Sequence, residues 1–180
     1  MKLNLGGGSK EMEGFINVDL KGDGMIWDLN KYPYPFKDNS IEEIKAFHII
    51  EHLNNYQLFF KEVLRMLKPR GKLHIKVPHF TSHGAFSEYH IHKGFWYYCF
   101  TNKRMITKTS LDLEDNIFNK FDEIKRKINF ENKYFWNWLI KPLVNLWVFP
   151  VIYETTFLYS LFPAKEIEII LIKSGKEYAK

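Results

Sequence analysis

The segment from Leu3 to Leu29 decides the fold of this chain: it reads LNLGGG at 3–8, INVDL at 16–20 and WDL at 27–29. An apolar strand runs into three glycines, a second strand ends on Asp19, and Asp28 follows further along. Glycine lets backbone N–H groups approach a ligand because no Cβ intervenes, and a carboxylate at the end of the next strand can accept hydrogen bonds from a ribose. This order predicts a pocket for an adenosine-containing cofactor.

The glycine run is not decisive by itself, because such a run is often only a turn. Glu11 stands where the third glycine of a G-x-G-x-x-G dinucleotide site would lie. No G-K-[ST] sequence follows, which argues against a phosphate-binding P-loop.

Three downstream motifs make the pattern specific: PYPFKDNSIEEI at 33–44, HIIEHL at 48–53 and LRMLKPRGKL at 64–73. Together with the glycine run they resemble the class I S-adenosylmethionine-dependent methyltransferases (methyltransferase type 11-like). The resemblance implies an α/β, Rossmann-like and mostly parallel sheet with an antiparallel edge hairpin at the C-terminus. Few residues separate Gly8 from Asp19, so we expect the N-terminal helices to be reduced.

Composition is consistent with one globular domain over 1–180. Hydrophobic residues make up 46% of the 180 residues and aromatic residues 17%, which favours a packed core. Cys99 is the single cysteine, so it cannot form an internal disulfide, and it is better explained as a small buried residue than as a nucleophile.

No signal peptide pattern opens the chain, and we expect a cytoplasmic location. The net charge of +5 is spread along the chain, which argues against a nucleic-acid partner.

Periodicity predicts the elements in order. Pro69 and Gly71 are expected to stop the first helix, and the last two strands match the antiparallel hairpin that the resemblance implies. We predict strands over 2–5, 15–19, 25–28, 42–48, 73–78, 121–130 and 166–173, and an amphipathic helix over 55–67.

An aromatic-rich insertion at about 132–164 separates the last two predicted strands. Its longest uncharged run, 142–153, is shorter than a bilayer span requires. Three alternatives stay open for 134–162: packing against the sheet or in a homodimer, contact with a membrane surface, or a wall of the substrate pocket.

The resemblance also implies a cofactor site for S-adenosylmethionine. Gly6 and Gly8 border its methionine and ribose portions, Asp19 accepts from the ribose hydroxyls, Asp28 and Leu29 frame the adenine, and His48 closes the methionine end. Gly7 stands where the family often has cysteine. The predicted cofactor-binding residues are therefore Gly6, Gly7, Gly8, Asp19, Asp28, Leu29 and His48.

The sequence HIIEH at 48–52 also fits a zinc-protease pattern. Both histidines would then have to project from one face of a helix. Because His48 directly follows a strand, we expect a strand-to-helix junction in which Glu51 and His52 hydrogen-bond near the following helix, and no metal.

Four histidines, at 79, 83, 90 and 92, lie just beyond the fifth predicted strand. A hydroxyl acceptor needs a base, and histidine titrates near neutral pH. We predict that His79, His83 or His90 acts as the catalytic base, with Glu88 orienting it and Ser82, Tyr89 and Trp96 lining the acceptor. Ordinary loop hydrogen bonds, or a zinc ion, are the alternatives.

These features predict a methyltransferase that uses S-adenosylmethionine on a small-molecule acceptor, with O-methylation of a sugar or polysaccharide precursor as the reaction. The acceptor class rests on the resemblance alone. A non-catalytic binding or scaffold protein that retains the fold is the alternative. A lipid-linked acceptor is a third hypothesis, suggested by the aromatic insertion.

Overall fold

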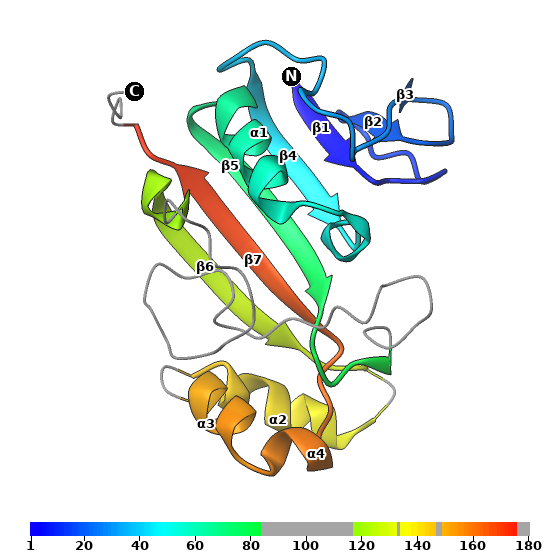
Figure 1. Cartoon of the computed structure of the whole chain (residues 1–180). Helices are drawn as coiled ribbons and strands as arrows, with labels where there is room; N and C mark the ends of the chain where they lie inside the picture. The colour runs from blue at the N-terminus through cyan, green and yellow to red at the C-terminus, as the bar shows by residue number, and fades with distance from the viewer. Residues whose placement is uncertain (84–116, 133, 147–148, 176–180) are drawn as a thin grey trace.

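One mixed sheet organises the chain, and the computed structural model describes residues 1–83, 117–132, 134–146 and 149–175. Within these ranges seven strands lie in the order β3-β2-β1-β4-β5-β7-β6 (Figure 1). β1 to β5 are parallel, whereas β7 runs antiparallel to both β5 and β6. The strands are β1 (Lys2–Leu5), β2 (Ile16–Asp19), β3 (Met25–Ile26), β4 (Ile41–Phe47), β5 (Leu67–Pro78), β6 (Phe121–Asn129) and β7 (Glu166–Lys173).

The Rossmann-like sheet with an antiparallel C-terminal hairpin is confirmed, and so are the reduced N-terminal helices. The connection from β1 to β2 contains turns and no helix. The order of strands reverses between β1 and β4, which is the switch point where ligands bind in such sheets. The described helices are η1 (Ile50–His52), α1 (Tyr56–Met66), η5 (Ile117–Lys120), α2 (Trp136–Val144), α3 (Phe149–Thr155) and α4 (Leu158–Leu161).

The fifth strand begins earlier than the sequence predicts. α1 ends at Met66 and β5 begins at the next residue, Leu67, which pairs with Ile41. Pro69 and Gly71 therefore lie inside β5, beside an irregularity in the register with β4, and the expectation that they stop the helix was wrong. The structure allows this because Arg70 has a positive φ of 64°, which fits a local bulge.

The main core lies between α1 and one face of the sheet. Buried and partly exposed side chains alternate along β5, and Leu73, Ile75 and Val77 are fully buried. Phe59 and Phe60 of α1 belong to the same cluster. Burying each such side chain contributes about 1.5–3 kcal/mol.

The opposite face of the sheet is charged instead of apolar. Glu43 of β4 pairs with Lys2 at 3.5 Å and with Lys72 at 3.2 Å, and His74 of β5 pairs with Glu168 of β7 at 2.8 Å. Parallel sheets are normally buried on both faces. Here the described part of the chain replaces an apolar second face with ladders of ion pairs.

Arg65 of α1 fixes the polar turn that precedes β4. Its guanidinium donates to the carbonyl oxygens of Phe36 at 2.6 Å and Tyr34 at 3.0 Å, and to Asp38 at 2.7 Å. Glu62 accepts from the backbone N–H of Tyr34 at 2.6 Å. The PYPFKDNS motif is therefore a turn fastened to α1 at the amino-terminal end of β4.

The predicted insertion contains α2, α3 and α4, and they lie at the carboxyl ends of the parallel strands (Figure 1). The last residue of β6, Asn129, and the last of β5, Pro78, both pair with Glu166, the first of β7. A small separate core holds these helices together: Ile128, Phe130, Val144, Tyr153 and Ala164. None of the described helices is both long and apolar enough to cross a membrane. That 1–180 forms a single domain stays a prediction.

Candidate cofactor site

The glycine run follows β1 directly and is shaped by its neighbours. Gly6 has a φ of +72°, and a Cβ there would lie 2.5 Å from Cγ1 of Ile49. A Cβ on Gly7 would lie 1.8 Å from Oδ1 of Asn17, whereas one on Gly8 would meet no atom within 4 Å. Gly6 and Gly7 are thus required by packing, while Gly8 borders open space.

Asp19 at the end of β2 holds this run. Its Oδ2 accepts from the backbone N–H of Gly8 at 2.8 Å, and its Oδ1 accepts from the N–H of Leu20 at 2.6 Å. A carboxylate offers about four acceptor directions, so Asp19 keeps capacity for further donors. The glycine run and Asp19 meet at one edge of the sheet.

Two asparagines beneath the run were not predicted as site residues. Nδ2 of Asn17 donates to the carbonyl oxygen of Gly8 at 2.6 Å, and Nδ2 of Asn4 donates to Oδ1 of Asn17 at 2.9 Å. Asn4 and Asn17 are directly paired across β1 and β2. Side chains two apart in a strand share a face. Asn4 lies two residues before Gly6 and Asn17 two residues before Asp19, and this spacing could have predicted that both asparagines border the site.

Asp28 and Leu29 differ in how they are placed. Asp28 follows β3 at the same edge, where its Oδ1 accepts from the N–H of Asn30 at 2.9 Å. Leu29 is only 5% exposed and lies in the main core, and its carbonyl oxygen accepts from the hydroxyl of Tyr34 at 2.8 Å. The side chain of Leu29 therefore packs in the main core, and its contact with adenine stays a prediction.

His48 directly follows β4 at the switch point and lies in an ionic network. Its Nε2 is 2.9 Å from Glu166 and its Nδ1 is 3.4 Å from Glu51. The bond to Glu166, helped by Glu51, raises the pKa of His48 to about 9. His48 in turn lowers the pKa of Glu166 to about 2, to which Lys76 at 3.4 Å contributes. His48 is therefore an imidazolium at neutral pH.

His48 also has an unusual backbone conformation. Its φ is +53°, a region that residues with a Cβ rarely adopt. Glu51, in the short helix η1, is fully buried, and its carboxylate lies within ion-pair distance of His48 without a hydrogen bond from the described residues. The strand-to-helix junction at 48–52 is confirmed, with a 3₁₀ helix at 50–52.

Of the three predicted catalytic histidines, the structure describes His79 and His83. His79 is fully buried, with Nε2 3.1 Å from Glu154 of α3 and Nδ1 2.8 Å from the hydroxyl of Thr81. Both ring nitrogens are engaged, so His79 positions α3 and is not open to an acceptor. His83 is exposed. His90 lies outside the described residues, as do Glu88, Tyr89, His92, Trp96 and Cys99.

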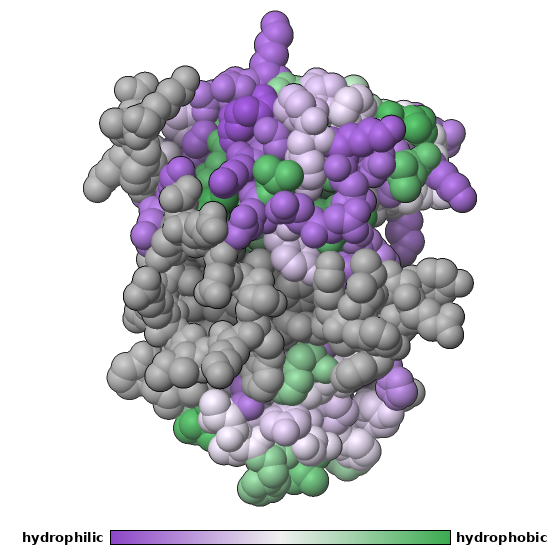
Figure 2. Space-filling view, in the orientation of Figure 1, coloured by the Kyte–Doolittle hydropathy of each residue, from purple (hydrophilic) through white to green (hydrophobic). Residues whose placement is uncertain are grey.

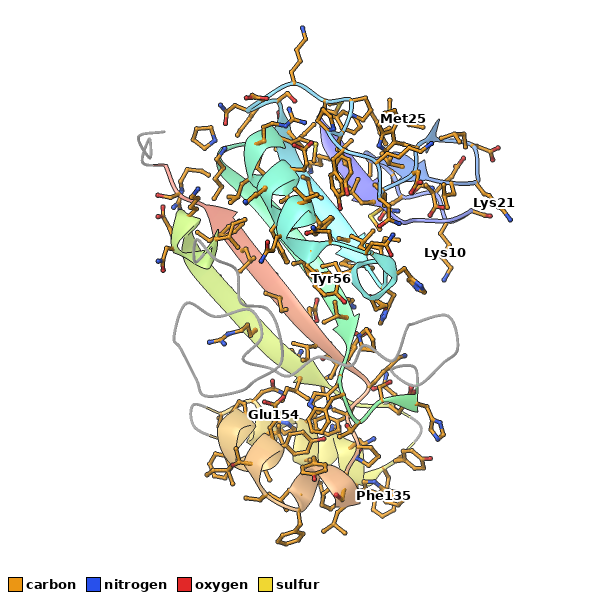
Figure 3. The ribbon with its side chains drawn as sticks, in the orientation of Figure 1. Lys10, Lys21, Met25, Tyr56, Phe135 and Glu154 are labelled. Carbon is orange, nitrogen blue, oxygen red and sulfur yellow. The ribbon has the colours of Figure 1, made fainter. Side chains whose placement is uncertain are left out.

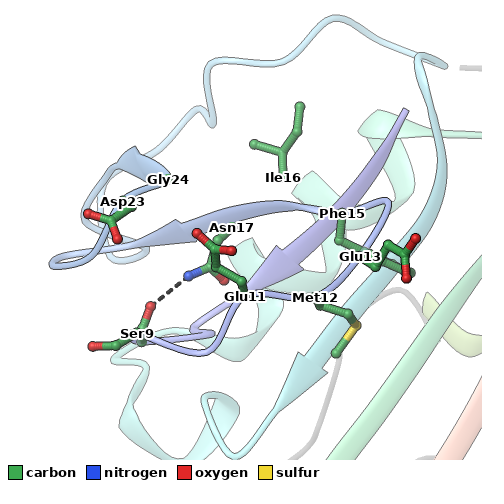
Figure 4. Close-up of a pocket in the computed structure, with 10 residues that line it drawn as sticks. Ser9, Glu11, Met12, Glu13, Phe15, Ile16, Asn17, Asp23 and Gly24 are labelled. Carbon is green, nitrogen blue, oxygen red and sulfur yellow. Dashed lines mark hydrogen bonds between the residues drawn. The ribbon is translucent and has the colours of Figure 1, made fainter.

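A hollow of about 300 Å³ adjoins the glycine run (Figure 4). Gly8 and Asn17 form part of its wall, and Glu11, Glu13 and Asp23 add three carboxylates. Within the described ranges no group of acidic, histidine or cysteine residues is arranged to hold a metal ion. The surroundings of Gly8 are therefore acidic, which disfavours a ligand that carries phosphate.

Comparisons with known proteins find a family match over part of the chain. Residues 11–75 match the family model described as a methyltransferase domain. No curated protein sequence matches the chain.

Solved structures share the fold at low sequence identity. A S-adenosylmethionine-dependent methyltransferase from Archaeoglobus fulgidus has a TM-score of 0.54 at 14% identity, covering 96% of this chain and 85% of its own. A Haloferax volcanii methyltransferase in complex with the Trm112 methyltransferase activator has a TM-score of 0.58 at 12% identity, covering 96% and 82%. Phosphoethanolamine N-methyltransferase 2 from Haemonchus contortus, in complex with S-adenosylmethionine, has a TM-score of 0.53 at 15% identity, covering 97% and 48%.

Proposed function

Because this chain carries a methyltransferase domain and has the fold of the S-adenosylmethionine-dependent methyltransferases, we propose that it methylates a hydroxyl group of a small sugar or polysaccharide precursor. S-adenosylmethionine is the cofactor of this family. The hydroxyl and sugar parts of the proposal rest on the family resemblance of the sequence, and a cytoplasmic location stays a prediction.

The contact between Gly8 and Asp19 is the observation that carries the proposal. It joins the glycine run after β1 to the carboxylate after β2, beside the switch point of the sheet. Open α/β sheets bind ligands at this place. Gly8 borders open space, and Asp19 retains acceptor capacity, as a ribose diol requires.

The charges around the site fit an adenosyl sulfonium better than a dinucleotide. Carboxylates line the hollow beside Gly8, and they would repel pyrophosphate. Around His48 the charges balance, because Glu51 and Glu166 face the imidazolium and Lys76. The acidic hollow is therefore the part of the site that favours a sulfonium cation over pyrophosphate.

The residues receive roles according to their placement. Gly6 and Gly7 let the loop pack against Ile49 and Asn17, Gly8 borders the cofactor, and Asp19 accepts from the ribose. Asp28 contacts the adenine, with Leu29 supporting its turn from the core. His48 borders the methionine end.

In methyl transfer the main task of the protein is to position the two reactants. When bound, S-adenosylmethionine supplies an activated methyl group, and the chain must align the acceptor and exclude water. A hydroxyl acceptor also needs a group that accepts its proton. We assign this role to His83 or His90, because His79 is buried in its pair with Glu154.

Calorimetry of S-adenosylmethionine binding tests the cofactor site. Asp19→Asn keeps an oxygen for the Gly8 amide but removes the charge, and we expect affinity to fall about tenfold. Asp38→Asn is the matched control, since Asp38 lies before β4 at the opposite end of the strands. Equal affinity in Asp19→Asn and Asp38→Asn would remove Asp19 from the cofactor site. Methyl transfer to a panel of sugars and sugar nucleotides, with isotope-labelled cofactor, tests the acceptor.

A non-catalytic binding protein that keeps this fold is the second candidate. The observation that favours it is that the backbone groups of Gly8 already have partners within the chain: its N–H donates to Asp19 and its carbonyl oxygen accepts from Asn17. Thermal unfolding with S-adenosylhomocysteine separates the two, because a ligand that binds the native state raises the melting temperature. No shift at about millimolar ligand would favour the non-catalytic protein.

A further inference from the structure

The outer surface of α2, α3 and α4 is apolar. Phe135 is 78% exposed, Trp138 80% and Phe157 70%. Figure 2 shows apolar side chains gathered at the end of the molecule formed by these helices, whereas the sheet end is mostly polar, and Figure 3 places Phe135 away from the strands. We call the following set the apolar face: Phe135, Trp138, Leu139, Leu143, Leu146, Phe157 and Leu161.

The apolar face is not needed to hold the three helices in place. Their inner side has its own buried cluster, which includes Val144 and Tyr153. Polar contacts add to it: Asn145 exchanges hydrogen bonds with the backbone of Ile128 at 2.7 and 2.8 Å, and Nδ2 of Asn137 donates to the carbonyl oxygen of Glu131 at 2.6 Å. Exposed apolar patches of this kind mark interaction surfaces.

The charges of residues 132–164 indicate what kind of partner binds the apolar face. Glu154 is the only carboxylate between residues 132 and 164. It is 3% exposed and faces His79 on the inner side, so it contributes no negative charge to the outer surface (Figure 3). Lys141 lies in α2, whereas Lys165, which flanks the segment, pairs with the half-exposed Glu131 at 3.8 Å. Protruding aromatic rings beside Lys141, with no exposed carboxylate among the described residues of 132–164, suit an anionic lipid surface.

We propose that the apolar face inserts into the interface of an anionic lipid bilayer. This binding would bring the carboxyl ends of the parallel strands close to a lipid-linked acceptor. The described helices are too short to span a bilayer, so they would lie within its interface. Protruding rings insert between acyl chains without a complementary hollow, which a second protein surface would have to provide. The second half of this proposal, the acceptor, rests on the proposed methyltransferase function.

The position of the helices links docking to the site. The insertion leaves β6 and enters β7 beside the end of β5. The pair between His79 and Glu154 ties α3 to the residue that follows β5. A bilayer under the apolar face would therefore lie on the carboxyl side of the sheet, where the proposed cofactor site also lies (Figure 1).

Co-sedimentation with vesicles tests the docking. The full chain is mixed with vesicles of phosphatidylcholine and phosphatidylglycerol, or of phosphatidylcholine alone. We expect pelleting with the anionic vesicles, reduced at least about tenfold in a Phe135→Ser, Trp138→Ser, Phe157→Ser variant. Leu20→Ser with Ile26→Ser is the matched control, because these side chains are 62% and 59% exposed near β3. Circular dichroism and binding of S-adenosylhomocysteine verify that both variants are folded.

Each outcome decides one half of the proposal. No pelleting, or equal pelleting of both variants, overturns the docking. A dimer in light scattering that the triple variant abolishes, without vesicle binding, assigns the face to a second copy and also overturns it. Vesicle binding without methylation of a lipid-linked sugar overturns only the acceptor half, and unchanged S-adenosylhomocysteine binding then shows that the cofactor site is intact.

Discussion

Gly8 and Asp19 are joined by a 2.8 Å hydrogen bond from the backbone N–H of Gly8 to Oδ2 of Asp19. This contact brings a glycine of the turn after β1 to a carboxylate at the end of β2. It also anchors a loop that, in the described structure, has no helix behind it. Asp19 therefore serves both the proposed cofactor and the local structure, and its substitutions should report on both.

Removing the carboxylate of Asp19 should lower stability. Asp19→Ala loses the bonds from the backbone amides of Gly8 and Leu20, and we expect the free energy of unfolding to fall by about 1–2 kcal/mol. Asp19→Asn keeps one acceptor and should lose less. Urea denaturation measures both, and equal stability of Asp19→Ala and the native chain would contradict the anchoring role.

Gly6 and Gly8 should respond differently to alanine. Both have positive φ, which costs about 1 kcal/mol for a residue with a Cβ. Gly6→Ala also places its Cβ against Ile49, so we expect a loss of about 3 kcal/mol or more. Gly8→Ala meets open space and should show the backbone cost alone. Thermal unfolding of the two variants gives the comparison, and similar losses in both would contradict the packing of Gly6 on Ile49.

The pair of His48 and Glu166 predicts a defined dependence of stability on pH. The pKa of His48 is raised to about 9, so its contribution is complete below about 6.5 and is lost as the pH rises through 9. The pKa of Glu166 is lowered to about 2, so its contribution is present above about 4.5 and is lost as the pH falls through 2. The imidazole is 41% exposed, and solvent screening limits the effect to on the order of 1 kcal/mol.

Melting temperatures between pH 5 and 10 test this dependence. The native chain should lose stability across the alkaline range, and His48→Gln should lose less over the same range. His83→Gln is the control, because His83 is exposed. Parallel curves for the native chain and His48→Gln would show that His48 does not carry the alkaline loss.

The buried pair of His79 and Glu154 should matter for folding of the helical unit. His79→Ala leaves a space beneath Tyr153 and removes the ring that Glu154 contacts, and we expect a loss of about 3 kcal/mol. His83→Ala, at an exposed position, should change stability by less than about 0.5 kcal/mol. Chemical denaturation gives the free energy of unfolding of both variants. An unchanged free energy of unfolding in His79→Ala would contradict the structural role of His79.

The sequence predicted the sheet because its signals are local. Alternating apolar residues mark β4, β5 and β7, and the amphipathic pattern at 55–67 marks α1 within a residue at each end. The boundary between α1 and β5 was missed, since Pro69 and Gly71 normally end a helix and the bulge at Arg70 depends on pairing with β4.

What the sequence alone determined is an order of motifs: a glycine run after one strand, an aspartate after the next and a polar turn before β4. Only the tertiary structure decided which side chains meet. His48 contacts Glu166 across a separation of 118 residues, and His79 contacts Glu154 across 75 residues. Local periodicity reflects backbone geometry and so can be read from neighbours in the chain. Ion pairs between distant residues depend on how strands and helices pack, which leaves no local pattern.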